Sequence, residues 1–223
     1  MNKFIQQDLT PDIVKTDNPR IGVIALSTDF TIEQDFRNIC HHNPVDIFVN
    51  RIPFENPLNH KNYLKMADHI SQVSSQILPS EDIDIVAYGC TSGTIAIGAD
   101  RIKEEVNKAK PKAKVTTPIT AAMKAFNHLG LKKIAVLTPY PKDVNATVYN
   151  YLIDNNINVE SFSSFNLEYD SEIAQVSLAS LEKEISKIDL SNVDGLFVSC
   201  TALKIVDVLD RVESSQNTVV ISS

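Results

Sequence analysis

The sequence predicts an α/β protein with two pseudo-symmetric, doubly wound lobes, each built on a four-stranded parallel sheet, with the active site in the cleft between them. Three observations predict this fold: eight short apolar runs, helical segments between successive runs, and a motif that occurs once in each half. With 223 residues, of which 43% are hydrophobic, the chain is long enough to bury a core in each half.

Eight apolar runs, rich in Val, Ile and Phe, have the length and composition of buried strands. They cover residues 21–26, 45–52, 82–88 and 113–117 in the first set, and 132–137, 156–165, 193–199 and 217–222 in the second. Segments with helical spacing separate them, at residues 31–40, 62–78, 94–108, 119–129, 143–154, 171–188 and 203–212. This alternation favours parallel strands with right-handed crossovers.

The repeated motif is an Asp followed six residues later by Cys-Thr, beginning at Asp84 and again at Asp194. It puts Cys90 and Cys200 at the end of the third strand of each set, 110 residues apart. A repeat of this size indicates two similar units, each large enough for its own core.

The repeat also predicts the boundary between the lobes. We expect an N-terminal lobe at residues 1–129 and a C-terminal lobe at residues 130–223. The helix at 119–129 has no counterpart after the last strand, so we expect the second lobe to lack a final helix.

Composition and charge exclude several classes of function. The net charge of −7 argues against a surface that binds nucleic acid. The three cysteines, Cys40, Cys90 and Cys200, form neither a disulfide framework nor a metal-ligand spacing, so they predict free thiols in a reducing compartment. Neither a signal peptide nor an apolar run of membrane-spanning length is present, and we therefore expect a cytoplasmic protein without a membrane partner.

Cys90 and Cys200 are the candidate catalytic residues, because each ends a predicted strand and precedes a predicted helix. Open α/β sheets bind their ligands at this position. The N–H groups and the dipole of a helix N-terminus favour anions, so we expect a lowered thiol pKa and a bound carboxylate here. Thr91, Ser92 and Thr201 supply further donors beside the two thiols.

Two thiols on opposite faces of one substrate suit a reaction that needs no cofactor. One thiolate would remove a proton from carbon while the other thiol delivers one, or one cysteine would add to a double bond during cis–trans isomerisation. The residue types leave both reactions open. We expect no metal, because the histidines lack a ligand spacing, and no nucleotide, because no phosphate-binding glycine loop is present. Cys40 has no repeat partner, and packing is its expected role.

The segments YGCTSGT (88–94) and VSCTALK (198–204) resemble the aspartate/glutamate racemase superfamily. The closer resemblance is to the branch of maleate cis–trans isomerase, arylmalonate decarboxylase and the ectoine-utilisation protein EutA, and the pattern looks most like EutA. The resemblance implies a racemase or isomerase of a small carboxylate, an amino acid or a dicarboxylate, and also a homodimer. Arylmalonate decarboxylases keep only the second cysteine, so the resemblance disfavours decarboxylation.

The resemblance also implies further substrate-binding residues. The segment 27–33, with Thr28 and Asp29, is similar to a family segment in which an Asn binds substrate. An ionised Asp cannot donate to a carboxylate, so Asp29 favours a substrate ammonium group. The resemblance places Thr117, Tyr140 and Asn166 at positions that line the cleft.

Two alternatives to the proton-transferring isomerase stay open. One is a maleate-type isomerase that works through a covalent cysteine adduct. The other is a protein that binds a small ligand in the same cleft without turnover.

Overall fold

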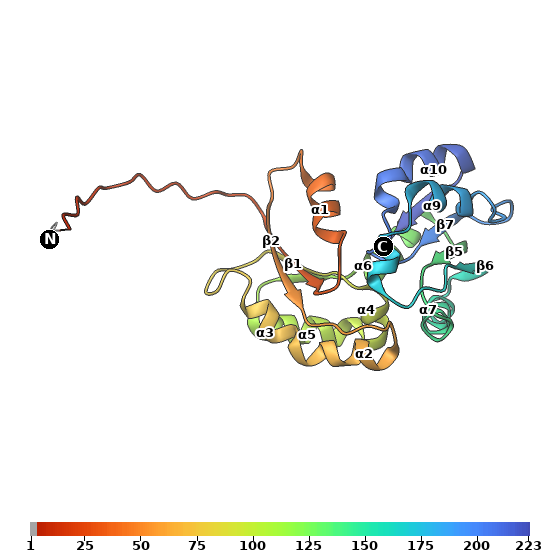
Figure 1. The fold of residues 1–223 in the computed structure, drawn as a ribbon, viewed down its shortest axis with the longest axis horizontal. Helices are drawn as coiled ribbons and strands as arrows, with labels where there is room; N and C mark the ends of the chain where they lie inside the picture. Colours follow the sequence, from red (N-terminus) through yellow and green to blue (C-terminus); the bar gives the residue numbers. More distant parts are fainter. Residues whose placement is uncertain (1–3) are drawn as a thin grey trace.

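The computed structural model describes residues 4–223, which fold into two four-stranded parallel sheets with helices on their faces (Figure 1). Residues 4–19 precede the first strand as an exposed, extended segment. All eight predicted strands and the predicted α/β class are confirmed. Within the described residues, no helix combines the length and the apolar character that crossing a bilayer would need.

The first sheet has the strand order β2-β1-β3-β4, and all its pairs are parallel. Helix α1 lies on one face, whereas α2, α3 and α5 lie on the other (Figure 1). The central strand β1 is buried through most of its length because helices cover both faces. The elements are β1 (Arg20–Leu26), α1 (Ile32–Cys40), β2 (Asp46–Ile52), α2 (His60–Lys65), the 3-10 helix η1 (Met66–His69), α3 (Ile70–Ser75), β3 (Ile85–Tyr88), α4 (Thr91–Ile97), α5 (Ala99–Ala109), β4 (Lys114–Thr116) and α6 (Pro118–Leu129).

The second sheet repeats this arrangement with the order β6-β5-β7-β8, again parallel throughout. Helix α7 lies on one side of it, and α9 and α10 lie on the other (Figure 1). The elements are β5 (Lys133–Thr138), α7 (Lys142–Asp154), β6 (Asn158–Ser164), α8 (Asp170–Ala174), α9 (Leu178–Ile185), β7 (Gly195–Val198), the 3-10 helix η2 (Ile205–Val208), α10 (Leu209–Gln216) and β8 (Val219–Ser222).

Several predicted helices are divided in the structure. The segment 94–108 begins earlier, at Thr91, and breaks at Gly98, whose φ of 93° lies outside the helical region. Residues 62–78 form three short helices, and residues 171–188 form two. Apolar spacing indicates which side of a segment is buried but does not locate such breaks.

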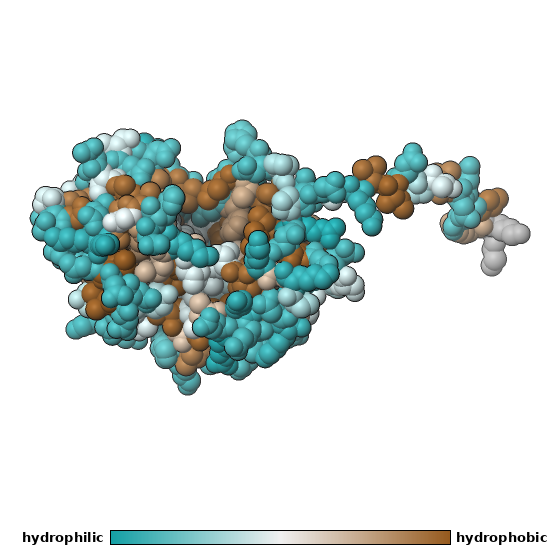
Figure 2. Space-filling view, turned by 180° about the vertical axis from the view of Figure 1, so that it is seen from behind, coloured by the Kyte–Doolittle hydropathy of each residue, from teal (hydrophilic) through white to brown (hydrophobic). Residues whose placement is uncertain are grey.

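The two sheets share one hydrophobic core. A single cluster of buried side chains includes Ile24 and Val86 of the first sheet together with Val136 and Phe197 of the second. Phe126 of α6 packs edge-on against Phe197, with ring centroids 5.3 Å apart. The carboxyl ends of both sheets therefore meet at a fixed junction. Figure 2, which views the molecule from behind the view of Figure 1, shows a hollow with apolar residues around it.

Candidate functional site

Cys90 and Cys200 line one pocket at the junction of the two sheets. Each follows its strand by two residues, since β3 ends at Tyr88 and β7 ends at Val198. The cavity has a volume of about 10 Å³, which is room for roughly one water molecule. Its walls come from Leu26, Asp29, Leu58, Tyr63, Cys90, Thr91, Ser92, Tyr140, Asp170, Cys200, Thr201 and Ala202.

Two loops close this pocket. Leu58 follows β2, and Asp170 begins α8 beyond β6. The backbone N–H of Leu58 donates to the carbonyl of Glu168 at 2.9 Å, which ties one loop to the other. As the side chains stand in this structure, the cavity is too small for a substrate larger than water.

Cys90 is the N-cap residue of α4, as its position before a helix predicts. Its φ of −145° and ψ of 117° are extended, and its Sγ accepts a hydrogen bond from the N–H of Gly93 at 3.2 Å. A Cβ on Gly93 would lie 2.8 Å from this sulfur, so glycine is what allows the close approach. The first turn of α4 thus holds the thiol at a source of backbone donors.

Cys200 does not occupy the equivalent place. A helical segment follows it as expected, but this segment does not begin at the thiol. The chain turns back after β7, with the N–H of Leu203 donating to the carbonyl of Cys200 at 3.1 Å. The first helical residue is Ile205, in a 3-10 helix. Cys200 itself has a φ of 134°, which is rare for a residue with a side chain. Only one of the two thiols therefore sits at a helix N-terminus.

The predicted lowering of the thiol pKa values is wrong for the closed pocket. Burial raises the pKa of Cys90 to about 12, and the hydrogen bond from Gly93 offsets only part of this. Burial, followed by the nearby charge of Asp170, raises the pKa of Cys200 well above its usual value. Removal from water disfavours a thiolate more strongly than the helix dipole favours it.

Two carboxyl groups line the same pocket. Thr28 donates its hydroxyl to Oδ2 of Asp170, and Thr201 donates to Oδ2 of Asp29 at 3.5 Å. Each bond joins segments that follow strands of different sheets, so each acid is held across the junction. Burial raises the pKa of Asp170 to about 6 and also raises the pKa of Asp29.

Asp29 additionally fixes the start of α1. Its Oδ1 accepts hydrogen bonds from the N–H groups of Thr31 and Ile32, both at 2.8 Å. Thr31 in turn donates to the carbonyl of Thr201 at 2.6 Å. Asp29, which the resemblance assigns to substrate binding, therefore also holds the start of α1. Its other oxygen, Oδ2, is the one that contacts the pocket residue Thr201.

Asp170 and Tyr63 belong to the pocket although sequence reasoning did not select them. Tyr63 lies in a helical segment and is indistinguishable there from an ordinary core aromatic. Asp170 is one of two acidic residues in the first turn of α8, where a carboxylate is common for helix stability alone. The one sequence feature that sets Asp170 apart is that no Lys, Arg or His lies close to it along the chain.

The other predicted residues divide into two groups. Thr91, Ser92, Tyr140 and Thr201 line the pocket with the cysteines, as does Asp29. Thr28 does not line the pocket, but its hydroxyl donates a hydrogen bond to Asp170, which does. Thr117 does not line it. Its side chain caps α6 with Thr120, and it lines the larger neighbouring pocket instead.

Asn166 also lies outside the pocket. Its side chain is exposed, and its φ of 55° places it in a left-handed turn after β6. Its backbone N–H donates to Oγ of Ser164 at 3.0 Å. In this structure the segment brings Asp170, four residues later, to the cysteines instead.

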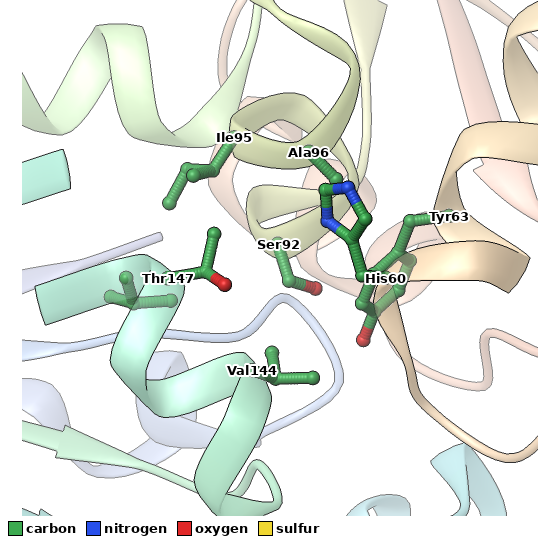
Figure 3. Close-up of a pocket in the computed structure, with 8 residues that line it drawn as sticks. His60, Tyr63, Ser92, Ile95, Ala96, Val144 and Thr147 are labelled. Carbon is green, nitrogen blue, oxygen red and sulfur yellow. The ribbon is translucent and has the colours of Figure 1, made fainter. Parts of the chain in front are cut away.

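A second small pocket adjoins the first and shares Tyr63 and Ser92 with it (Figure 3). It lies between α2, α4 and α7, with His60 on one side and Thr147 on the other. Its remaining walls are aliphatic, including Ile95 and Val144. It extends the polar site toward the first turn of α4.

A third, larger pocket shares Thr201 with the cysteine pocket. Its volume is about 250 Å³, and it is lined mainly by apolar groups from α1, β3 and α6. Cys40 contributes to this lining, in keeping with its expected packing role. Asp35 also lines it, and burial together with Asp207 raises the pKa of that carboxyl to about 7.

Among residues 4–223 no group of three or more His, Cys, Asp or Glu side chains could hold a metal ion. The wall of the cysteine pocket carries two cysteines, two acids and several hydroxyl groups. They can exchange protons and bind a small polar ligand.

Comparison with known proteins identifies relatives of the whole chain. A sequence model of the arylmalonate decarboxylase family matches residues 56–223. Maleate isomerase of Pseudomonas putida is 22% identical over 217 residues, which are 92% of this chain and 86% of that protein. Maleate isomerase of Geobacillus stearothermophilus is 24% identical over the same shares.

Solved structures show the same fold. The maleate isomerase Iso from Pseudomonas putida superimposes with a TM-score of 0.82 at 19% identity, covering 92% of this chain and 88% of that one. A Nocardia farcinica maleate cis–trans isomerase mutant with a covalently bound succinylcysteine intermediate has a TM-score of 0.83 at 16% identity, covering 92% and 87%. Unliganded arylmalonate decarboxylase has a TM-score of 0.70 at 20% identity, with the same coverage.

Proposed function

Because this chain belongs to the arylmalonate decarboxylase family, we propose that it is a cofactor-independent isomerase of a small carboxylate, with Cys90 and Cys200 as its acid and base. The observation that carries the proposal is the single closed pocket lined by both thiols. Polar groups for a carboxylate lie beside them, in the first turn of α4 and at Tyr140.

The proposed reaction moves one proton in and one proton out. The thiolate of one cysteine removes the proton from the carbon next to the carboxylate, and the electron pair of that C–H bond moves into the carboxylate. The thiol of the other cysteine then delivers its proton to the opposite face of the same carbon. Backbone N–H groups and hydroxyls stabilise the intermediate charge.

Thiolate formation requires the pocket to open. Burial disfavours the thiolate of both cysteines in the closed pocket. When the loops around Leu58 and Asp170 separate, water reaches the thiols and one of them can lose its proton before the pocket closes on the substrate.

A maleate-type cis–trans isomerase is the second candidate. It is supported by the maleate isomerase relatives and by the succinylcysteine intermediate in the Nocardia structure. In that reaction one thiolate would add to one carbon of the double bond, and the π electron pair would move to the other carbon and its carboxylate. After rotation about the new single bond, that electron pair would re-form the double bond as the C–S bond breaks and the thiolate leaves. The atoms of substrate and enzyme are the same before and after.

We also propose a cytoplasmic homodimer with a role in ectoine utilisation. Free thiols support a reducing compartment, since all three cysteines are unpaired. The likeness to EutA supports the pathway, and the likeness to this enzyme branch supports the dimer.

A panel measurement tests the proposal. Wild-type protein and the Cys90→Ser/Cys200→Ser double variant are incubated in D2O with amino acids, saturated dicarboxylates and maleate, and the products are followed by NMR. Deuterium at the α-carbon supports proton transfer, whereas fumarate from maleate supports the second candidate. If the double variant still turns over the substrate that the wild-type protein turns over, both candidate functions are contradicted. Binding without any turnover supports a ligand-binding protein.

A further inference from the structure

The cysteine pocket has two acidic side chains in its wall and no basic one. Asp29 and Asp170 line it, and none of its other ten lining residues is Lys, Arg or His. Both acids are buried, with exposed fractions of 7% and 5%. Arg51 donates to the backbone carbonyl of Asp29 at 2.8 Å and its charge lowers the pKa of that carboxyl, but its ion pair is with Glu33. Neither Asp29 nor Asp170 has an ion-pair partner among the described residues. A buried carboxylate without such a partner is costly, so its retention in a binding pocket points to a partner that arrives with the ligand.

We propose that Asp29 and Asp170 form a subsite for a positively charged group of the substrate, so that the substrate carries an ammonium group beside its carboxylate. This inference rests on the proposed function and specifies its substrate class. It makes Asp170 a specificity-determining residue of the site.

The hydrogen bonds of the two acids leave acceptor capacity for a ligand. Oδ1 of Asp29 is used at the start of α1, but its Oδ2 has only the long 3.5 Å contact with Thr201. Oδ2 of Asp170 accepts from Thr28, and its Oδ1 has no hydrogen bond among the described residues. An ammonium group has three donors and could engage one oxygen from each acid.

Two unpartnered hydroxyls in the same pocket point independently to a polar ligand. Tyr63 Oη and Thr91 Oγ1 have no hydrogen-bond partner within residues 4–223, and both side chains line the pocket. Tyr63 is 2% exposed and Thr91 is 1% exposed. Buried hydroxyls nearly always have a partner, so a bound carboxylate is the expected acceptor.

A dicarboxylate without an amine fits this pocket less well. Its second carboxylate would face two acids of the same charge, and no basic side chain in the wall would offset the repulsion. At pH 7.5 Asp170 is ionised, because its pKa is about 6. The remaining titratable groups in the wall, Tyr63, Tyr140 and the two cysteines, carry no positive charge in either protonation state.

Charged thiol reagents test the subsite without knowledge of the substrate. In a Cys40→Ser background, the rates at which 2-aminoethyl and 2-sulfonatoethyl methanethiosulfonate modify Cys90 and Cys200 are measured by peptide mass spectrometry at pH 7.5. The thiolate attacks the reagent sulfur, a disulfide forms, and methanesulfinate leaves. Rates are normalised to those of free cysteine.

The proposal predicts at least a tenfold preference for the cationic reagent. The Asp29→Asn/Asp170→Asn variant keeps the shape of the pocket and should lower this preference to about twofold or less. Asp143→Asn changes an exposed carboxyl in the first turn of α7 and should leave the preference unchanged. Equal rates, or a preference for the anionic reagent, in the wild-type background would overturn the subsite.

Turnover separates failure of the subsite from failure of the proposed function. Exchange of 2-aminobutyrate at least tenfold faster than that of succinate, with the order reversed in the double Asn variant, supports both. Faster turnover of maleate or succinate than of any amino acid overturns the subsite and leaves the isomerase intact. Cationic preference in the reagent test, with no turnover of any compound, supports the subsite and contradicts the isomerase.

Discussion

The backbone N–H of Gly93 donates a hydrogen bond to the Sγ of Cys90 at 3.2 Å, and this bond fixes the thiol at the N-terminus of α4. It depends on the absence of a side chain at Gly93. A Cβ there would lie 2.8 Å from the sulfur and 2.7 Å from Cε of Met66. The local sequence thus positions one of the two proposed catalytic thiols.

Gly93→Ala should therefore displace the Cys90 thiol. We expect at least a hundredfold lower kcat and a loss of about 1–3 kcal/mol in stability from overpacking, measured by the D2O assay and by urea unfolding. Gly22→Ala is the control, because its Cβ would meet only side-chain atoms of Ile77 and Ile83, away from the pocket. Full activity of Gly93→Ala would contradict the proposed importance of this bond.

The thiol of Cys90 should react slowly at neutral pH. Because burial raises its pKa to about 12, the thiolate fraction rises tenfold for each pH unit up to that value. We expect the rate of iodoacetamide labelling at Cys90 to increase through pH 10 without a plateau, whereas free cysteine levels off near its pKa of about 8.5. A plateau at Cys90 below pH 9 would show that the pocket stabilises the thiolate.

Asp170→Asn should stabilise the empty protein at neutral pH. Burial raises the pKa of Asp170 from 3.8 to about 6 in the folded protein. Ionisation of Asp170 therefore lowers the free energy of unfolding progressively above pH 4, and the whole loss is present above pH 6. Each pH unit between the two pKa values corresponds to about 1.4 kcal/mol, which gives a gain of about 1–3 kcal/mol at pH 8 and little at pH 4.

Urea unfolding at the two pH values measures this gain. Asp143→Asn is the control, because that carboxylate is exposed in the first turn of α7. A gain from Asp170→Asn that is as large at pH 4 as at pH 8 would mean that the charge is not its cause.

The junction between the sheets should loosen when Thr31 loses its hydroxyl. Thr31 donates to the carbonyl of Thr201 at 2.6 Å, from the start of α1 to the turn after β7. Thr31→Val should cost about 1 kcal/mol and should speed thiol labelling at Cys200. Thr31→Ser keeps the donor and should behave as the wild type does. Identical labelling in Thr31→Val would show that this bond does not control access.

Apolar runs and a repeated motif were sufficient to predict the strands, the two sheets and the position of Cys90. The period of a buried strand and the Cys-Thr motif are local signals, which the sequence displays directly. The turn after Cys200 was missed because its conformation depends on packing between distant segments. The boundary between residues 129 and 130 stays a prediction.

The pocket was predictable only in part, because side chains from distant segments meet there. Thr28 and Asp170 are 142 residues apart, and no sequence spacing indicates their hydrogen bond. Thr117 caps α6 with its hydroxyl and lines the larger neighbouring pocket rather than the cysteine pocket. Asn166 looked like a ligand donor, yet the left-handed turn exposes it.

The measurement that tests the two-thiol mechanism most directly compares Cys90→Ser, Cys200→Ser and Cys40→Ser with the wild type, on whichever substrate of the panel the wild type turns over. We predict that each of the first two substitutions lowers kcat by at least a thousandfold, and that Cys40→Ser retains full activity. Retained turnover in either Cys90→Ser or Cys200→Ser would contradict catalysis by the pair.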